Sequence, residues 1–274
     1  MQYFKKDIIV DTSGKSDYIA TLQAYIPDNS PEINASRVRP AVLVLPGGGY
    51  EFTSDRENEP IALKFVSEGI CAFVLKYSCA PARFPQALCE SLTAIKFIRE
   101  NAKEFFIDTD NIAVCGFSAG GHLAASVGVL WNKTFVAEQL GEVGDSVKPN
   151  KLILSYPVIK NGEFSHQGSF DNLLGDANKL EELLTLTSLE KQVSSDTPPS
   201  FIWHTYEDDC VPVQNSLVFA TELVAHAIPV ELHIYRRGGH GLSLGNNLVD
   251  SNRGIGIKHD SSDWIDKAIR FIYD

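Results

Sequence analysis

The sequence predicts a doubly wound α/β fold, in which a mostly parallel sheet of about eight strands is flanked by helices. Six short apolar runs, rich in β-branched and aromatic residues, recur along the chain. Helical patterns with apolar residues three and four positions apart separate several of these runs. Two stretches near the N-terminus instead alternate polar and apolar residues, which is typical of a hairpin.

The six apolar runs are expected to be strands buried on both faces, because they are continuous rather than alternating. They span residues 38–49, 70–78, 111–118, 151–159, 199–207 and 229–237. Residues 4–10 and 18–26 form the expected hairpin around the turn-rich segment 11–17, and we expect it at the sheet edge. Helices are predicted over residues 60–68, 87–105, 122–131, 216–227 and 263–273.

The length of 274 residues lies within the range of one large α/β sheet, so we expect residues 1–274 to form a single domain. Residues 160–199 stand apart, because they are polar and longer than a simple crossover needs. They contain the helical stretch ANKLEELLTL. Two interpretations remain open for this segment: an inserted lid or cap, or an ordinary crossover helix with loose ends.

Charge and composition narrow the classes of partner. The chain has 24 Lys and Arg against 35 Asp and Glu, a net charge of -11, which repels nucleic acids and anionic membranes. The N-terminal MQYFKKDIIV lacks the apolar region of a secretory signal, and no later run approaches the ~20 apolar residues of a membrane span. We therefore expect a cytoplasmic protein that binds neither nucleic acid nor membrane.

The five cysteines are scattered and lack the short paired spacing of a zinc or redox site. We expect them to be reduced thiols. No metal site and no organic cofactor is implied by the sequence.

A candidate nucleophile lies in the segment NIAVCGFSAGGHLAAS. Gly116-Phe117-Ser118-Ala119-Gly120 has the pattern G-x-S-x-G and falls directly between a predicted strand and a predicted helix. A serine on such a sharp turn needs small neighbours, which the two glycines supply. The turn aims the Ser118 hydroxyl toward the N-terminal end of the helix and places the Ala119 N–H where it can donate to an oxyanion.

The segment GFSAGGHLAA resembles the nucleophile elbow of the α/β hydrolases, in particular the branch of hormone-sensitive-lipase-like esterases and bacterial acetyl esterases. LPGGGY resembles the HGGG oxyanion loop of that branch. Pro46 stands where lipases have His, and this form is similar to acetylxylan-esterase-like carbohydrate esterases. YSCAPARFPQAL and SYPVI are further similar stretches, and the likeness runs from about Arg39 to the end. The resemblance implies the α/β-hydrolase fold and activity on acetyl or similar esters, often on carbohydrates.

A serine hydroxyl needs a neighbouring base, and that base needs an orienting carboxylate. His240 is the predicted base, because it lies in a glycine-rich loop after the last predicted strand and α/β hydrolases carry the triad in the order Ser, acid, His. Three adjacent acids, Glu207, Asp208 and Asp209, follow the preceding strand. By resemblance the acid is four residues before the proline of D-x-x-V-P, which selects Asp208, with Asp209 as the alternative.

The remaining histidines have other expected places. His122 lies within the elbow helix and His204 within a buried strand, where hydrogen-bonded core histidines are common. The others show no comparable context and are expected at the surface or in the lid segment; they are His166, His226, His233 and His259.

The three glycines 47–49 suit a loop whose N–H groups point at an oxyanion, because a side chain there would block the approach of substrate. By resemblance Gly48 is the expected donor beside Ala119, and Gly49 is the second choice. For Tyr50, which follows the glycines, the sequence leaves two roles open: contact with the acyl group or a sugar ring of the substrate, or packing.

The leading hypothesis is a serine esterase that hydrolyses short-chain carboxylic esters, with acetylated sugars among the expected substrates, through an acyl-enzyme on Ser118. A small amidase or arylformamidase is an alternative, because such enzymes share the elbow and the fold. An oligopeptidase is disfavoured, because roughly forty residues before LPGGGY leave no room for a further N-terminal domain. A non-catalytic binding module of the same fold is the third alternative. Acyl length, alcohol and oligomeric state, a homodimer included, stay open.

Overall fold

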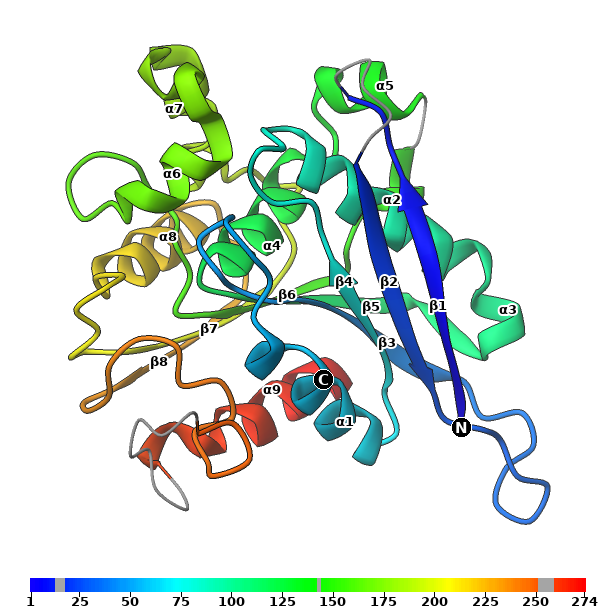
Figure 1. The fold of residues 1–274 in the computed structure, drawn as a ribbon. Coiled ribbons are helices and arrows are strands. Elements are labelled where there is room, and N and C mark those ends of the chain that lie inside the picture. Colours follow the sequence, from blue (N-terminus) through cyan, green and yellow to red (C-terminus); the bar gives the residue numbers. More distant parts are fainter. Residues whose placement is uncertain (13–17, 142–143, 251–258) are drawn as a thin grey trace.

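The described part of the chain forms an eight-stranded sheet with helices packed on both faces (Figure 1). The structure is a computed structural model and describes residues 1–12, 18–141, 144–250 and 259–274. The strands are β1 (Gln2–Ile9), β2 (Ile19–Ile26), β3 (Arg39–Leu45), β4 (Cys71–Lys76), β5 (Ile107–Phe117), β6 (Lys151–Ser155), β7 (Ser200–Thr205) and β8 (Val230–Tyr235). Their order across the sheet is β1-β2-β4-β3-β5-β6-β7-β8.

The two N-terminal strands form the predicted antiparallel hairpin at one edge of the sheet. Strand β1 pairs with β2, for example Asp7 with Thr21, and β2 runs antiparallel to β4. All other neighbouring strands are parallel. The predicted turn at 11–17 lies largely outside the described residues. The predicted doubly wound, mostly parallel sheet is confirmed.

The inner strands are buried on both faces, as their continuous apolar sequences require. Every residue of β3 and β7 is buried. Successive residues of β3 face opposite layers: Leu43 joins one hydrophobic cluster, while Val42 and Val44 join the other. The sheet therefore has a hydrophobic core on each side.

Helices fill both layers. One layer holds α2, α4, α5 and α8, and the other holds α1 and α9, as their buried residues in the two clusters show. The helices are α1 (Glu59–Ser67), α2 (Gln86–Glu100), α3 (Ala102–Phe105), α4 (Ala119–Leu130), α5 (Thr134–Leu140), α6 (Gln167–Leu174), α7 (Glu181–Leu186), α8 (Gln214–Ala225) and α9 (Trp264–Tyr273). Short 3-10 turns are η1 (Asp55–Glu57), η2 (Gly144–Val147), η3 (Gly175–Lys179), η4 (Leu189–Gln192) and η5 (Asp260–Asp263). No helix among the described residues combines the length and apolar character needed to cross a membrane.

The predicted helix 87–105 is divided in two at Asn101, a difference from the sequence prediction. Both the backbone N–H and the side-chain amide of Asn101 donate to the Phe97 carbonyl. An asparagine side chain that competes with the backbone in this way ends a helix. The chain restarts as α3, one residue later.

The segment 160–199 holds α6, η3, α7 and η4 between β6 and β7. The predicted helical stretch ANKLEELLTL corresponds to the end of η3 followed by α7. In Figure 1 helices α6 and α7 project from the layered body beside α8. Helices α5 and α6 were not expected from the sequence pattern.

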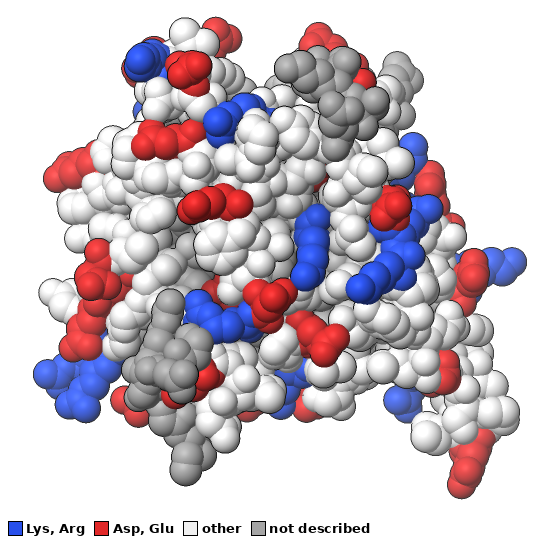
Figure 2. Space-filling model, viewed as in Figure 1, with Lys and Arg blue, Asp and Glu red and all other residues white. Residues whose placement is uncertain are grey.

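Charged side chains of both signs are interspersed on the face of the molecule drawn in Figure 2. Neither sign forms a continuous stripe on this face. The absence of a nucleic-acid partner stays a prediction from the net charge of -11.

Glycines bring α4 close to the ends of β3 and β5. A Cβ at Gly120 would overlap the carbonyl oxygens of Leu45 and Pro46, and a Cβ at Gly116 would overlap the carbonyl oxygen of Gly120. These neighbours are backbone atoms, which cannot rotate away as a side chain would. Only glycine therefore fits at either position.

Replacement of Gly120 by Ala should lower the free energy of unfolding by about 3 kcal/mol or more, because the new methyl group forces the backbone apart. Urea denaturation of the purified parent and variant measures this difference in the free energy of unfolding. Gly168→Ala is the matched control, since a Cβ there has its nearest neighbour at 3.7 Å. Equal stability of the two variants would contradict the close approach of α4.

Candidate active site

Ser118 lies at the turn between β5 and α4, with φ 54° and ψ -119°. A positive φ is uncommon for a residue with a side chain and indicates a strained turn held by its surroundings. The Ser118 N–H donates to the Ser155 carbonyl, and the Ser118 carbonyl accepts from His122 and Val158. These bonds fix the serine backbone and present its hydroxyl at the carboxyl ends of the parallel strands.

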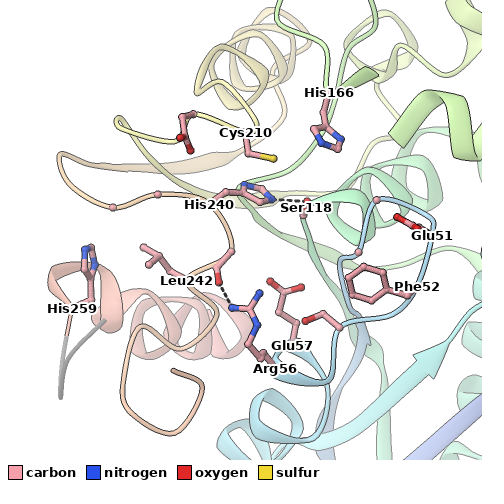
Figure 3. A pocket seen from close by; sticks show the side chains of 17 residues that line it. Glu51, Phe52, Arg56, Glu57, Ser118, His166, Cys210, His240, Leu242 and His259 are labelled. Atoms are coloured by element: carbon pink, nitrogen blue, oxygen red, sulfur yellow. Dashed lines mark hydrogen bonds between the residues drawn. The ribbon is translucent and has the colours of Figure 1, made fainter. Parts of the chain in front are cut away.

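Three side chains from separate loops form a continuous hydrogen-bonded chain. His240 Nε2 lies 2.7 Å from Ser118 Oγ, and His240 Nδ1 lies 2.7 Å from Asp208 Oδ2 (Figure 3 draws the first contact). A carboxylate only accepts, so Nδ1 carries the proton and Nε2 accepts the serine O–H. The structure thus brings together the predicted nucleophile, base and acid in the geometry of a triad.

Asp208 is the acid that reaches His240. Its side chain is fully buried, and Oδ1 accepts the N–H groups of Cys210 and Val211. His204 Nε2 approaches Oδ2 at 3.2 Å from the interior. Burial alone raises the pKa of Asp208, but the hydrogen bonds from His204 and His240 outweigh it and hold the pKa well below its usual range. Asp209, the alternative acid, is exposed at the pocket wall.

The glycine loop after β3 lies beside Ser118. The Gly47 N–H is engaged by the Glu57 carboxylate at 2.8 Å, so it is not an oxyanion donor. Gly48 and Gly49 line the pocket and have positive φ of 130° and 64°. Ala119 is the first residue of α4, where a backbone N–H has no acceptor within the helix. Gly48 and Gly49 thus share the pocket with Ser118, and Ala119 follows Ser118 at the start of α4. Their role as oxyanion donors stays a prediction.

The pocket in front of Ser118 has a volume of about 740 Å³. Figure 3 shows Phe52 and Glu51 on one side of Ser118, and Leu242 and His259 on the other. Much of the exposed lining is apolar, and charged or polar residues also contribute to it; besides those named they include Arg56, Glu57, His166 and Asp209. The volume exceeds that of an acetyl group.

Tyr50 is not among the residues that line this pocket. Its side chain is 3% exposed, and its hydroxyl lies 2.9 Å from His122 Nδ1. The ring packs edge-on against Tyr77 and His122. Of the two roles left open by the sequence, the geometry gives Tyr50 packing and hydrogen bonding beneath the glycine loop, and it does not bring the ring to a substrate.

Several residues that line the pocket were not predicted from the sequence, and three of them, His166, Arg56 and Glu57, matter for its chemistry. His166, expected only at the surface or in the lid segment, lines the pocket from residues 160–199 and bonds Ser169 Oγ through Nδ1 at 2.8 Å. Burial and the neighbouring His240 lower the pKa of His166. Arg56 and Glu57 come from η1, a short irregular turn. No motif or periodicity marks any of the three in the sequence.

No group of three or more potential metal ligands occurs among the described residues. The absence of a metal and of a cofactor stays a prediction of the sequence.

The fold is that of the α/β hydrolases, and Ser118 lies at the strand-to-helix turn between β5 and α4. The BD-FAE family model matches residues 22–223, so the chain belongs to that family. A solved structure titled acetyl ester-xyloside bifunctional hydrolase, from Caldicellulosiruptor lactoaceticus, is 35% identical with a TM-score of 0.81, and the match covers 98% of this chain and 95% of that one.

Two curated relatives carry names that concern xylan. Endo-1,4-beta-xylanase B from Butyrivibrio fibrisolvens is 40% identical over 84% of this chain and 36% of its own length. Acetylxylan esterase from Xylanibacter ruminicola is 30% identical over 75% of this chain and 41% of its own length. The chain thus spans less than half the length of these relatives.

His122 provides a test of the buried support beneath the site. Its Nε2 lies 2.9 Å from the Thr187 carbonyl oxygen, which can only accept, so Nε2 carries the proton and Nδ1 accepts from Tyr50. Burial lowers the pKa of His122 to about 4. Below the unfolded value of about 6.5 the unfolded chain therefore takes up a proton that the folded chain refuses.

The free energy of unfolding of the parent should consequently fall relative to that of His122→Gln between pH 7 and pH 4, by up to about 3 kcal/mol. The contribution of neutral His122 to the free energy of unfolding is complete above the pKa of His122 in the unfolded chain. This contribution is lost as the pH falls toward the pKa of His122 in the folded chain. Urea denaturation of both proteins across this range measures the difference. Parallel pH profiles would contradict a buried neutral His122.

Proposed function

We propose that this protein is a serine esterase that hydrolyses short-chain carboxylic esters. The observation that carries the proposal is the unbroken chain from Ser118 Oγ through His240 to Asp208, with 2.7 Å at each step. The family membership supports it, because the relatives include named esterases.

In the proposed reaction Ser118 Oγ attacks the ester carbonyl carbon while His240 Nε2 takes the hydroxyl proton. The oxyanion accepts N–H groups of Ala119 and of Gly48 or Gly49. Collapse of the tetrahedral intermediate breaks the bond to the alkoxide, which takes the proton from His240 and leaves an acyl-serine. A water molecule then repeats the sequence and releases the acid. Asp208 stabilises the imidazolium in both halves.

For the substrate we propose an acetylated carbohydrate. The pocket of about 740 Å³ exceeds the need of an acetyl group and has room for a sugar-sized alcohol. Its wall carries Arg56, Asp209 and His259, which can bond sugar hydroxyls, and the exposed ring of Phe52 can pack on a sugar face. The names of the xylan-related relatives support the same substrate class.

We further propose that residues 160–199 act as a cap on this pocket within a single α/β-hydrolase domain. His166 enters the pocket from this segment, and Asn172 Nδ2 donates to the Gly49 carbonyl at 2.9 Å. The segment therefore contacts the proposed oxyanion loop directly.

The alternatives have weaker support. An amidase or arylformamidase would use the same three side chains, so its distinction from an esterase rests on substrate tests. A non-catalytic binding module would not need Ser118, His240 and Asp208 at hydrogen-bonding distance of one another.

Initial rates on p-nitrophenyl acetate, butyrate and octanoate, and on an acetylated xylo-oligosaccharide, test the proposal. The parent should hydrolyse the acetate fastest and release acetate from the sugar, and Ser118→Ala should remove both activities. Activity that survives Ser118→Ala, or hydrolysis of anilides but not of esters, would contradict it.

The pair Asp208 and Asp209 offers a matched comparison. Asp208→Asn should lower kcat by a factor on the order of 10⁴, the effect known for the triad acid of serine proteases, because the His240 ring loses its orienting acceptor. Asp209→Asn removes a charge from the exposed neighbour and should lower kcat by less than about tenfold, since Asp209 does not bond His240 directly. A larger loss at Asp209 would exchange the two roles.

A further inference from the structure

Glu57 is a buried carboxylate that joins two separate loops of the active site. It is 2% exposed and lies in η1, ten residues after the glycine loop begins. Glu57 Oε2 accepts the Gly47 N–H at 2.8 Å, and Oε1 accepts the Tyr156 hydroxyl at 2.6 Å. Both oxygens therefore act as acceptors, as expected of an ionised carboxylate.

Tyr156 extends this connection to the loop that carries His240. Its hydroxyl oxygen accepts the Ser243 N–H at 2.9 Å, three residues beyond the base. Its ring packs edge-on against the His240 ring, with centroids 5.1 Å apart. Tyr156 is 1% exposed, so its hydroxyl is shielded from bulk solvent and the loss of either partner is costly.

Arg56 makes a second connection to the same loop. Its Nη1 donates to the Gly241 carbonyl at 2.6 Å, and its own carbonyl accepts the Ser243 hydroxyl at 2.6 Å. Figure 3 shows Arg56 and Glu57 side by side on the pocket wall below Ser118. The dipeptide Arg56-Glu57 thus contacts Gly47, which precedes the proposed oxyanion donors, and Gly241 and Ser243, which follow the proposed base.

We infer that Glu57, aided by Arg56, is a positioning residue that fixes the oxyanion loop relative to the loop of His240. The inference rests on the proposed esterase function and extends it. Gly47 is the key contact, because its N–H direction sets the course of the chain into Gly48 and Gly49. A displacement of about 1 Å in such groups can change a rate by a factor on the order of 100.

The charge of Glu57 and its position predict opposite changes in kcat when Glu57 is replaced, so the experiment can distinguish them. A carboxylate beside the oxyanion loop repels the negative charge that develops during attack. On charge alone, removal of Glu57 would therefore raise kcat. If Glu57 acts by position, its replacement lowers kcat.

The experiment compares the parent with Glu57→Gln and Tyr156→Phe on p-nitrophenyl acetate. In Glu57→Gln one acceptor oxygen becomes a donor, so Gly47 or Tyr156 loses its partner. In Tyr156→Phe the ring stays, but Glu57 and Ser243 lose the bridging hydroxyl. We expect kcat to fall on the order of 100-fold in Glu57→Gln and at least about tenfold in Tyr156→Phe, with KM within about threefold.

A boronic acid that forms a tetrahedral adduct on serine provides a second readout. Its inhibition constant should weaken by about the same factor as kcat, because the adduct depends on the same N–H donors. In the double variant Glu57→Gln with Tyr156→Phe, the loss should be smaller than the product of the two single losses, since both act through one connection.

Glu90→Gln is the matched control. Glu90 is also a buried carboxylate and bonds Ser78 and Gln86 in another part of the core. It should keep kcat within about threefold at temperatures well below its midpoint of unfolding.

The outcomes are distinct. An inactive parent, or one whose activity survives Ser118→Ala, refutes the proposed function. An active parent with unchanged or raised kcat in Glu57→Gln overturns the positioning role, and so does a loss equalled by Glu90→Gln. If Glu57→Gln does not fold, Tyr156→Phe decides: parental kcat and boronate affinity overturn the inference.

Discussion

The close approach of α4 to the ends of β3 and β5 is the constraint on which the rest of the site depends. Glycines at 116 and 120 allow backbone to meet backbone there, and Ser118 takes its strained turn between them. Because β3 pairs with β5, the same approach brings the loop after β3 against the serine: a Cβ at Gly47 would lie 3.0 Å from the Ser118 Cβ. The positions of the proposed nucleophile and the proposed oxyanion loop therefore depend on one packing contact. The parallel order of β6 and β7 adds Tyr156 and Asp208 at the same edge of the sheet.

The two histidines buried beneath this edge, His122 and His204, are tolerated because both ring nitrogens of each have partners. His122 bonds Tyr50 and Thr187, and His204 bonds Ser216, Val211 and the triad acid. Burial of a polar group costs little free energy once its hydrogen bonds are satisfied. If one partner is lost, the remaining buried group carries its full desolvation penalty. The support of the site is thus specific as well as stable, since few other side chains could meet the same set of donors and acceptors.

Much of this arrangement could be predicted from the sequence, and the reason is topological. Continuous apolar runs identify buried parallel strands, and in such a sheet the residues after each run gather at one edge, so Ser118, Asp208 and His240 could be predicted together. His166, Arg56 and Glu57 could not, because they lie in irregular segments whose course depends on tertiary contacts.

Tyr50 shows a different limit. It adjoins the glycine loop in sequence, but its φ of 58° turns the chain so that the side chain is buried. The helix over 87–105 was wrong at Asn101 for a local reason, the competition of an amide side chain for a helical carbonyl.

The residues with strained backbone conformations at the site are held by its buried hydrogen bonds. Among the described residues, seven other than glycine have a positive φ, and four of them belong to the site or its support: Tyr50, Ser118, Tyr156 and Ser243. Such conformations cost on the order of 1–3 kcal/mol each and persist only where the surroundings over-determine them. Each of the four is held by buried hydrogen bonds: Tyr50 to His122, Ser118 to Ser155, Tyr156 to Glu57, and Ser243 to Tyr156. In the proposed mechanism these bonds also hold the reacting groups in place. The Ser155 carbonyl fixes the turn of Ser118, and the Tyr156 hydroxyl fixes Ser243 in the loop that carries His240.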